Sequence, residues 1–536
     1  MQDFDVQTVE IEAPFDVAFR YIADPGTLPE WTHAFRSVSD GRAILVTPEG
    51  AVDIGLEVRA SREAGTVDWT MTFPDGSVAQ AFSRLVERGV VASTAAPWGC
   101  CGASTARTGS RTSWEKSSRW RGRRLAGVEA RASQAPGVTP ALIVRVPGAA
   151  PGRVLLYGHL DKQPEFEGWE PGLGPWTPVR RDGRLYGRGA VDDGYALCAA
   201  LGALESLQSQ GRPHPTCVLL LECGEESGST DLPEHLAGLA PVLGTPDLVV
   251  ALDSEAGDFA RLWTTTSLRG VIMATLRVRV LTEGVHSGAA GGLVPGSFRI
   301  LRRLLDRIED AETGRLASLL DSPIPEPVHA QAKRTAAVLG ATVVDKFPWH
   351  LGTVPVDPDP ATLLVNNTWR GCLSVTGAEG LPALAAASNT HLPAVALKLS
   401  IRVPPTVSAA EAAHRLKETL ESEPPYGAEV TCSLDAFADG WAAATPPAWL
   451  AEAIDEASQR AFGQPAASLG TGGTIPFVEM LGSRFPRAAF LVTGVAGPQS
   501  NAHGPNEFLD LVAARHLTAC LADVLDAAGR CLSRER

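Results

Sequence analysis

Apolar and polar residues alternate strictly between residues 67 and 73. Val67, Trp69, Met71 and Phe73 are separated by Asp68, Thr70 and Thr72. A period of two predicts a half-buried antiparallel strand, and the Pro-Asp-Gly at 74–76 predicts a turn after it. Further upstream, Val9 and Ile11 predict a short strand. A helix is expected to open at residues 13–16 and to run through Phe19, Tyr21 and Ile22 to the Asp-Pro-Gly at 24–26.

The helix is followed by a short exit motif and then by several strands. The motif consists of Asp24, Pro25, Leu28, Pro29 and Trp31. This succession resembles the beginning of an SRPBCC (START-like) helix-grip domain, in which a sheet wraps around a long C-terminal helix. The resemblance covers residues 1–92 only, and it implies a partial α+β module.

Residues 93–124 lack a sustained apolar period. A Gly-Cys-Cys-Gly at 99–102 is followed by serines, threonines and six arginines, which predicts an irregular basic linker. One interpretation is a segment read out of frame, which joins two domains that each lack the element facing the other. It predicts no regular packing in 93–124 and an open apolar groove in the first module. An ordinary fusion with a flexible linker is the alternative.

From Leu125 onward, short apolar runs alternate with helical stretches, which is typical of an α/β fold. We expect a helix over 196–207. Strands are expected at 154–157, 217–221, 248–252 and 490–492. Each strand runs into a polar cluster, and open α/β sheets place their sites at the carboxyl ends of strands.

The polar clusters combine imidazoles and carboxylates in a recurring order. They contain His159 and Asp161, the pair Asp192-Asp193, the pair Glu225-Glu226, then Asp253, and finally His503. Taken singly, each can be a helix cap or a solvated loop. Taken together, mixed nitrogen and oxygen ligands suit zinc or manganese. Four terminal ligands and one bridging carboxylate suffice for two ions about 3.5–4 Å apart.

Composition narrows the partners of the protein. The chain has 536 residues, which predicts about three structural units, and a formal net charge of -14 that argues against nucleic-acid binding. No basic and apolar leader opens the chain, and no apolar run is long enough to span a bilayer. The nine cysteines include no CxxC pair. We therefore expect a cytoplasmic protein without a membrane or nucleic-acid partner.

Dense motifs from residue 125 to 536 carry a second resemblance. They are YGHLDKQP, GRGAVDDG, EESGS, LRG, GVHSG, LSIRVPP, TGGTIP and AHGPNE, in this order. The region resembles the M20 metallopeptidases, in particular their carnosinase-like, cytosolic nonspecific dipeptidase branch. The resemblance implies an α/β, two-metal aminopeptidase-like catalytic domain at 125–266 and 437–536. It also implies an inserted α+β lid and dimerisation domain at 267–436.

The same resemblance assigns roles within the polar clusters. His159 and Asp253 would bind one metal, Glu226 and His503 the other, and Asp192 would bridge both. Asp161 would support His159. Glu225 would be the general base that deprotonates the bridging water and then protonates the leaving amine. The resemblance implies two divalent ions per subunit, zinc first and manganese as the alternative.

The resemblance also assigns residues outside the polar clusters. In relatives, the histidine that matches His286 reaches the active site of the other subunit of a homodimer and stabilises the oxyanion. Arg402, Thr390 and Thr474 match positions that hold the substrate carboxylate, and an arginine fork suits that task. Two motifs depart from the family pattern: Gly194 and Tyr195 stand where relatives have the Lys-Gly of DDKG, and Thr474 replaces a common serine.

These observations predict an enzyme that hydrolyses a peptide bond near a free carboxylate, of the dipeptidase or carboxypeptidase type. Two alternatives stay open. One is an N-acyl amino acid amidohydrolase, because the same groups cleave any amide beside a carboxylate. The other is a non-catalytic ligand-binding protein that uses the N-terminal module. The expected substrate is accordingly a small peptide or an N-acyl amino acid.

Overall fold

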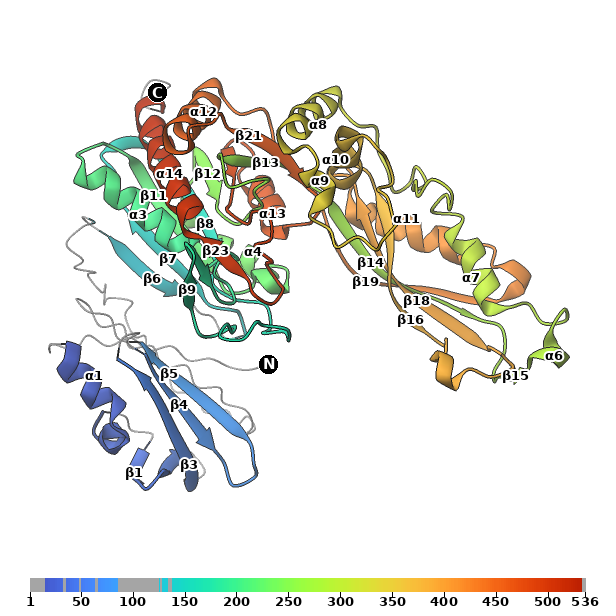
Figure 1. Ribbon diagram of the computed structural model, residues 1–536, viewed down its shortest axis with the longest axis horizontal. Coiled ribbons are helices and arrows are strands. Elements are labelled where there is room, and N and C mark those ends of the chain that lie inside the picture. The colour runs from blue at the N-terminus through green and yellow to red at the C-terminus, as the bar shows by residue number, and fades with distance from the viewer. Residues whose placement is uncertain are drawn as a thin grey trace. The chain divides into compact units, whose positions relative to one another are not determined.

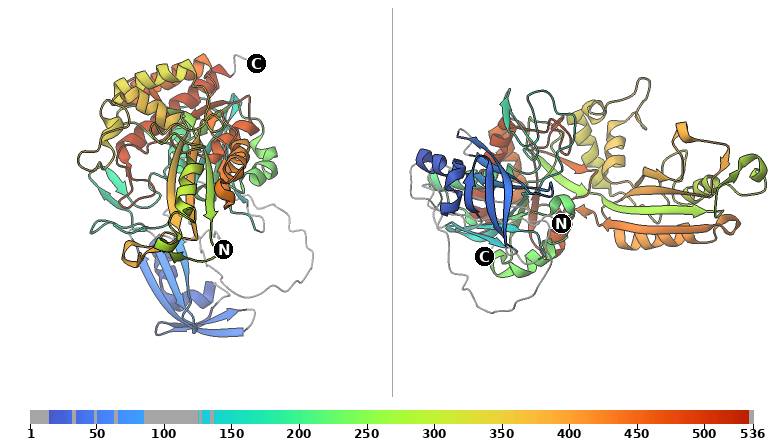
Figure 2. Two further views of the ribbon diagram at one scale, coloured as in Figure 1. Left: turned by 90° about the vertical axis from the view of Figure 1, so that its right-hand side faces the viewer. Right: turned by 90° about the horizontal axis from the view of Figure 1, so that it is seen from below.

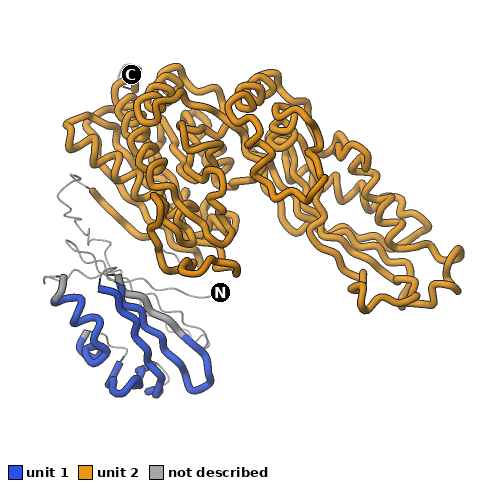
Figure 3. Tube along the Cα trace, viewed as in Figure 1, with its two compact units in different colours: residues 1–123 blue, residues 124–536 orange. Residues whose placement is uncertain are grey.

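A computed structural model describes residues 15–31, 35–47, 50–62, 66–84, 125, 128–133 and 137–532. The chain divides into two compact units, Met1–Arg123 and Arg124–Arg536 (Figure 3). The expected strand around Val9 and the linker at 93–124 lie outside the described residues. Within them, no helix combines the length and the apolar character needed to cross a membrane.

The first unit packs helix α1 against a five-stranded antiparallel sheet with the order β1-β2-β3-β4-β5. The strand predicted from alternation is confirmed as β4, in which Val67, Trp69 and Met71 are buried and the residues between them are not. The predicted helix is confirmed as α1, and it buries Phe19 and Ile22 in the same core. The bounds are α1 Phe15–Ala23, α2 Leu28–Trp31, β1 Phe35–Ser39, β2 Arg42–Thr47, β3 Gly50–Ser61, β4 Thr66–Thr72 and β5 Val78–Arg84.

The second unit is built on a six-stranded sheet with the order β22-β12-β8-β11-β7-β6. Its strands are β6 Glu129–Ser133, β7 Ala141–Val146, β8 Ala150–His159, β11 Pro215–Glu222, β12 Leu248–Ala251 and β22 Ala489–Val492. The four strands expected from apolar runs are all present, and they are adjacent and parallel to one another. Their carboxyl ends therefore meet at one edge, as the sequence predicted.

Helices cover both faces of this sheet (Figure 1). One face packs against α3 Ala196–Ser209, α12 Ala448–Phe462 and α14 Leu511–Cys531. The other packs against α4 Leu232–Gly238, α5 Ala240–Leu243 and α13 Pro476–Arg484. On the second face the ring of Tyr157 stacks on Phe477 with centroids 3.6 Å apart. Apolar runs without alternation are the sequence counterpart of a sheet buried on both faces.

A four-stranded antiparallel sheet with the order β16-β18-β14-β19 forms a second lobe of this unit (Figures 1 and 2). Helices α7 Ser297–Leu305 and α11 Ala409–Glu421 bury its inner face. The strands are β14 Gly270–Arg279, β16 Cys372–Glu379, β18 Ala394–Val403 and β19 Glu429–Ala438. At its end lie α6 Ser287–Ala290 and the small ribbon of β15 Val285–His286 with β17 Thr390–His391.

Part of the segment expected to form the lid packs instead against the part of the second unit that contains the six-stranded sheet, which is its first lobe. Helices α8 Glu326–Leu339 and α10 Pro360–Thr368, with the short α9 Thr342–Asp345 between them, pack beside β21 Ala467–Thr471. Thr335 Oγ1 donates to the Ser468 carbonyl at 2.6 Å, and Gln331 Nε2 donates to Thr266 Oγ1 at 2.6 Å. The segment 267–436 therefore does not form one continuous lobe.

Two small sheets complete the second unit. One joins β9 Val179–Arg181, β10 Arg184–Tyr186 and β23 Phe508–Asp510. The other joins β13 Trp263–Leu268, β20 Trp441–Ala442 and β21. The first brings the segment before the Asp192 loop next to the segment after His503, so two distant parts of the chain reach the edge of the main sheet together.

Candidate metal centre

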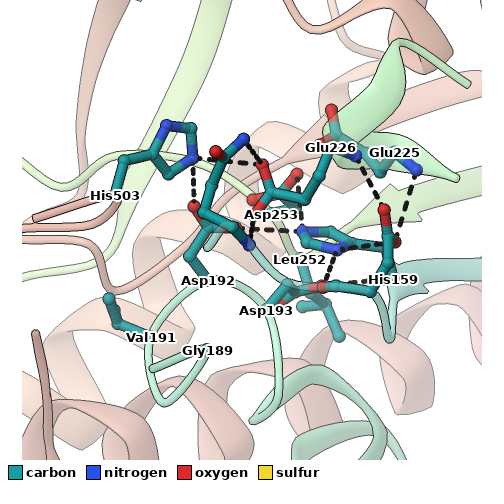
Figure 4. A network of polar contacts seen from close by, with 12 residues as sticks. His159, Gly189, Val191, Asp192, Asp193, Glu225, Glu226, Leu252, Asp253 and His503 are labelled. Atoms are coloured by element: carbon teal, nitrogen blue, oxygen red, sulfur yellow. Dashed lines mark hydrogen bonds and ion pairs between the residues drawn. The ribbon is translucent and has the colours of Figure 1, made fainter. Parts of the chain in front are cut away.

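The polar residues singled out from the sequence gather at the carboxyl edge of the main sheet (Figure 4). His159 is the last residue of β8, and Asp253 follows β12 by two residues. Glu225 and Glu226 stand in a short 3-10 turn after β11. Asp192 lies in the loop before α3, where its peptide bond to Asp193 is cis, and His503 lies in the loop after β22.

Two ligand triplets share Asp192. In the first, His159 Nε2 lies 2.9 Å from Asp192 Oδ1 and 3.7 Å from Asp253 Oδ2. In the second, His503 Nε2 lies 2.8 Å from Asp192 Oδ2 and 3.3 Å from Glu226 Oε2. Asp192 thus presents one carboxylate oxygen to each imidazole, as a bridging ligand must.

The donor set fits divalent cations. Within each triplet the ligand atoms lie within 4.8 Å of one another. Each triplet combines one imidazole nitrogen with two carboxylate groups, which is the chemistry that zinc and manganese accept. One shared and two separate carboxylates with two imidazoles supply three ligand groups to each of two ions.

Asp161 and Gln163 hold the ligands in place. Asp161 Oδ1 lies 3.3 Å from His159 Nδ1, on the side of the ring away from Asp192. The Asp161 carboxylate also accepts from the backbone N–H of Glu225 at 3.3 Å and of Glu226 at 2.9 Å. Gln163 Nε2 donates to Glu226 Oε2 at 2.7 Å. Such outer contacts fix the tautomer and the orientation of metal ligands.

Crowded carboxylates dominate the electrostatics. Burial, reinforced by the charges of Asp253 and Glu226, raises the pKa of Glu225 to about 8. Burial also raises the pKa of Asp253, to about 7. Burial lowers the pKa of His159, but hydrogen bonds to Asp161 and Asp192 outweigh it and raise that pKa to about 12. Hydrogen bonds to Asp192 and Glu226 raise the pKa of His503 to about 10. So much negative charge favours the binding of cations.

The residues expected to bind the substrate carboxylate fall into two places. Arg402 Nη1 donates to Thr474 Oγ1 at 2.7 Å, and Thr474 Oγ1 donates to the Arg269 carbonyl at 2.6 Å. Thr390 lies elsewhere, paired with His286 across the ribbon of β15 and β17. Both side chains are exposed, and this ribbon stands at the end of the second lobe, away from β8 and β12 (Figure 1). The structure does not bring His286 or Thr390 to the metal ligands of its own chain.

Two further residues support the site and had no role in the sequence prediction. Glu507 and Arg188 form a buried ion pair beneath the loop that carries Asp192. Both stand inside the motifs GRGAVDDG and AHGPNE. The sequence shows Arg188 four residues before Asp192 and Glu507 four residues after His503. Charged residues are too common near such motifs for this to predict that the two form an ion pair.

Known proteins resemble this chain over the region that contains the ligand triplets. The family model for peptidase family M20/M25/M40 matches residues 155–527. A Corynebacterium striatum protein named cysteinylglycine-S-conjugate dipeptidase is 30% identical over 392 residues, 72% of this chain and 82% of that protein.

Solved structures share the fold. The dipeptidase Dug1p of Saccharomyces cerevisiae superposes with a TM-score of 0.58 at 21% identity, over 75% of this chain and 88% of that one. The M20 family metallo-carboxypeptidase Sso-CP2 of Sulfolobus solfataricus gives a TM-score of 0.60 at 19% identity, over 75% of this chain and 91% of that one. With its family model, its relative and its paired ligand triplets, the chain belongs to peptidase family M20/M25/M40 and is a metal-dependent hydrolase.

Proposed function

We propose that this enzyme hydrolyses the amide bond of a dipeptide, or of the C-terminal residue of a short peptide, next to a free carboxylate. The observation that carries the proposal is the pair of ligand triplets sharing Asp192, with Glu225 beside them. The relative from Corynebacterium striatum is named as a dipeptidase, which supports the same class of substrate.

His159 and Asp253 would hold one cation, Glu226 and His503 the other, and Asp192 would bridge them. Zinc is the first choice for both, with manganese as the alternative. When bound, two such ions lower the pKa of water and polarise the scissile carbonyl.

Glu225 would act as the general base. Its carboxyl group is buried near Asp253 and Glu226, and its raised pKa suits a group that both takes up and returns a proton near neutral pH. It would accept the proton of the attacking water at a carboxylate oxygen and deliver it to the leaving amine nitrogen. Asp161 would keep His159 oriented through the imidazole Nδ1.

Arg402 would bind the substrate carboxylate. Its guanidinium is half-buried, and burial followed by the charge of Arg269 lowers its pKa, so an anion beside it is stabilising. Thr474 holds one guanidinium nitrogen and leaves the others for the substrate.

His286 and Thr390 would act on the other subunit of a homodimer formed through the second lobe, which is built from parts of the segment 267–436. Both are exposed on one ribbon, apart from the metal ligands of their own chain. An imidazole donor aimed at the developing oxyanion is a common stabilising device.

The first unit would be a partial helix-grip module of the SRPBCC type. Its support is the antiparallel sheet in sequential order, with α1 packed on one face.

The test is a hydrolysis screen over dipeptides, short peptides and N-acyl amino acids, with zinc and with manganese, together with a count of bound metal. Cleavage of peptides with two metal equivalents per chain supports the proposal. Cleavage of N-acyl amino acids alone would make the protein an amidohydrolase. Metal binding below two equivalents without turnover would favour a ligand-binding protein.

A further inference from the structure

Glu507 and Arg188 form an ion pair that is closed off from solvent. Arg188 Nη1 donates to Glu507 Oε2 at 2.6 Å, across 319 residues of sequence. The exposed fractions of the two side chains are 1% and 0%. Charges buried this deeply are expensive to desolvate, so their full set of contacts must offset the cost.

The Glu507 carboxylate holds the backbone of the Asp192 loop. Oε2 accepts from the N–H of Gly189 at 2.9 Å, and Oε1 accepts from the N–H of Val191 at 3.0 Å and of Asp192 at 3.3 Å. Three backbone donors on one carboxylate fix the course of that loop. The side chain shared by both ligand triplets therefore starts from a backbone that Glu507 sets.

Arg188 connects the same pair to two other loops. Nη2 donates to the carbonyl of Gly504 at 2.8 Å, next to His503. Nε donates to the carbonyl of Pro164 at 3.1 Å, and the neighbouring Gln163 binds Glu226. One ion pair thus contacts three loops. They carry Asp192, His503 and Gln163, and Gln163 binds Glu226.

The two cation sites differ in the structure that holds their ligands: regular strands at one site and an irregular turn at the other. His159 and Asp253 stand at the ends of neighbouring parallel strands, which the sheet ladder holds. His503 stands in an irregular turn in which Asn501, His503 and Asn506 all have positive φ. Asparagine tolerates this conformation, but for His503 it costs backbone strain that the surroundings must offset. The turn therefore depends on contacts such as those of Glu507 and Arg188.

We infer that Glu507 and Arg188 are positioning residues that set the spacing of Asp192, Glu226 and His503, and thereby the affinity of that one cation site. The inference rests on the proposed two-cation centre. It adds that residues which do not bind the cation hold its ligands in place.

The test is a zinc titration of the metal-free full chain by calorimetry, with the bound metal counted after dialysis. In Glu507→Gln, one of the two equivalents should bind about 10–100-fold more weakly, which is the usual effect of losing an outer contact at a metal site. The other equivalent should weaken much less, because it shares only Asp192 with this support and is also held by His159 and Asp253 at the strand ends. In Arg188→Lys, the same equivalent should weaken, because an ammonium cannot bridge Glu507, Gly504 and Pro164 together.

A matched control separates positioning from general damage. Asp526 on α14 is also buried and accepts from Arg212 at 2.9 Å and from Arg530. It lies near the C-terminal end of α14, where Leu532 approaches Gly152 at the start of β8, so it is at the opposite end of the strands from the ligands. Asp526→Asn should lower the melting temperature and leave both zinc equivalents unchanged.

Glu507→Gln leaves Arg188 unpaired, so the double variant Arg188→Met, Glu507→Gln is titrated as well. It removes both charges, and it should still lose affinity at one equivalent. Parent affinity for both equivalents in the double variant, or equal losses at both, would overturn the inference, as would the same loss in Asp526→Asn. A parent chain that binds two equivalents but cleaves no amide would refute the proposed activity and leave this inference standing. A parent that binds fewer than two would refute both.

Discussion

At the scale of single residues, the same carboxylate chemistry takes on different roles because the surroundings differ. Asp192 lies between two imidazoles, which hold its pKa below the usual range, although burial alone would raise it. Burial and the charge of Asp253 raise the pKa of Glu225, and they outweigh the opposing charge of His159. A ligand needs the ionised form and a base needs a pKa near neutrality, so neighbours rather than residue type divide the work.

The first prediction concerns Glu225. Glu225→Gln keeps the shape of the side chain and removes the group that accepts a proton. Metal content should stay at the parent value, while kcat falls by about 10²–10⁴. Steady-state kinetics beside a metal count checks this, and Glu234→Gln on α4 is a control at an exposed glutamate that belongs to neither ligand triplet. Turnover within a few-fold of the parent would remove Glu225 from its assigned role.

A second prediction follows from the raised pKa values of the two imidazoles. In the metal-free site the pKa of His159 is about 12 and that of His503 about 10, so both rings carry a proton at neutral pH. Each must lose that proton to bind a cation. Each cation binds one of these imidazoles, so the apparent affinity of each should rise with pH by up to about tenfold per unit below the pKa of His503. Calorimetric zinc titration between pH 6 and 8 measures the slope, and an affinity that falls with pH would contradict it.

At the scale of elements, the junction between β13 and β14 connects the two lobes of the second unit. Arg269 stands between these strands, and its backbone carbonyl accepts from Thr474, which in turn accepts from Arg402 on β18. One hydroxyl thus joins the loop after β21 to a strand of the other lobe. We expect the orientation of the Arg402 guanidinium to depend on this contact.

The third prediction compares two substitutions of Thr474. Thr474→Ser keeps the hydroxyl and should change kcat/KM by no more than a few-fold. Thr474→Val keeps the shape and loses the contact to a charged group, which should raise KM for a peptide with a free carboxylate by about 10–100-fold. The matched pair isolates the hydroxyl. Equal kinetics for the two variants would show that Thr474 does not orient Arg402.

At the scale of the whole molecule, the ribbon of β15 and β17 carries exposed residues that its own metal centre does not use. If His286 completes the site of the other subunit, a mixed dimer should recover activity. In a dimer of one His286→Ala chain and one Glu225→Gln chain, the first chain keeps its own base and receives the intact histidine of the second.

The fourth prediction is therefore complementation between two inactive variants. Each variant alone should have low turnover, and co-expressed chains purified with two different tags should regain activity at one of their two sites. Purified heterodimers as inactive as the separate variants would show that the site is not shared between subunits.

The sequence alone predicts those features of the fold that depend on residues close together in the chain. Periodicity and local composition determined β4, α1, α3 and the four parallel strands, because burial of alternate or continuous apolar residues is a local requirement. The polar residue after each strand could also be predicted, because parallel strands end at a common edge. In this way the sequence supplied His159, Glu226, Asp253 and His503, and the glycine-flanked loop before α3 supplied Asp192; the structure brings all five together.

Only the tertiary structure shows which residues hold these ligands in place and which of the predicted site residues lie far from them. Arg188 and Glu507 meet across 319 residues, and no local pattern encodes such a pair. Helices α8 and α10 pack beside β21, and nothing in their local sequence reveals this return. His286 and Thr390 match motifs of a site, yet they lie on a ribbon away from it. Side-chain type and spacing determine which chemistry is available, whereas distance between groups is set by chain packing, which only the complete fold fixes.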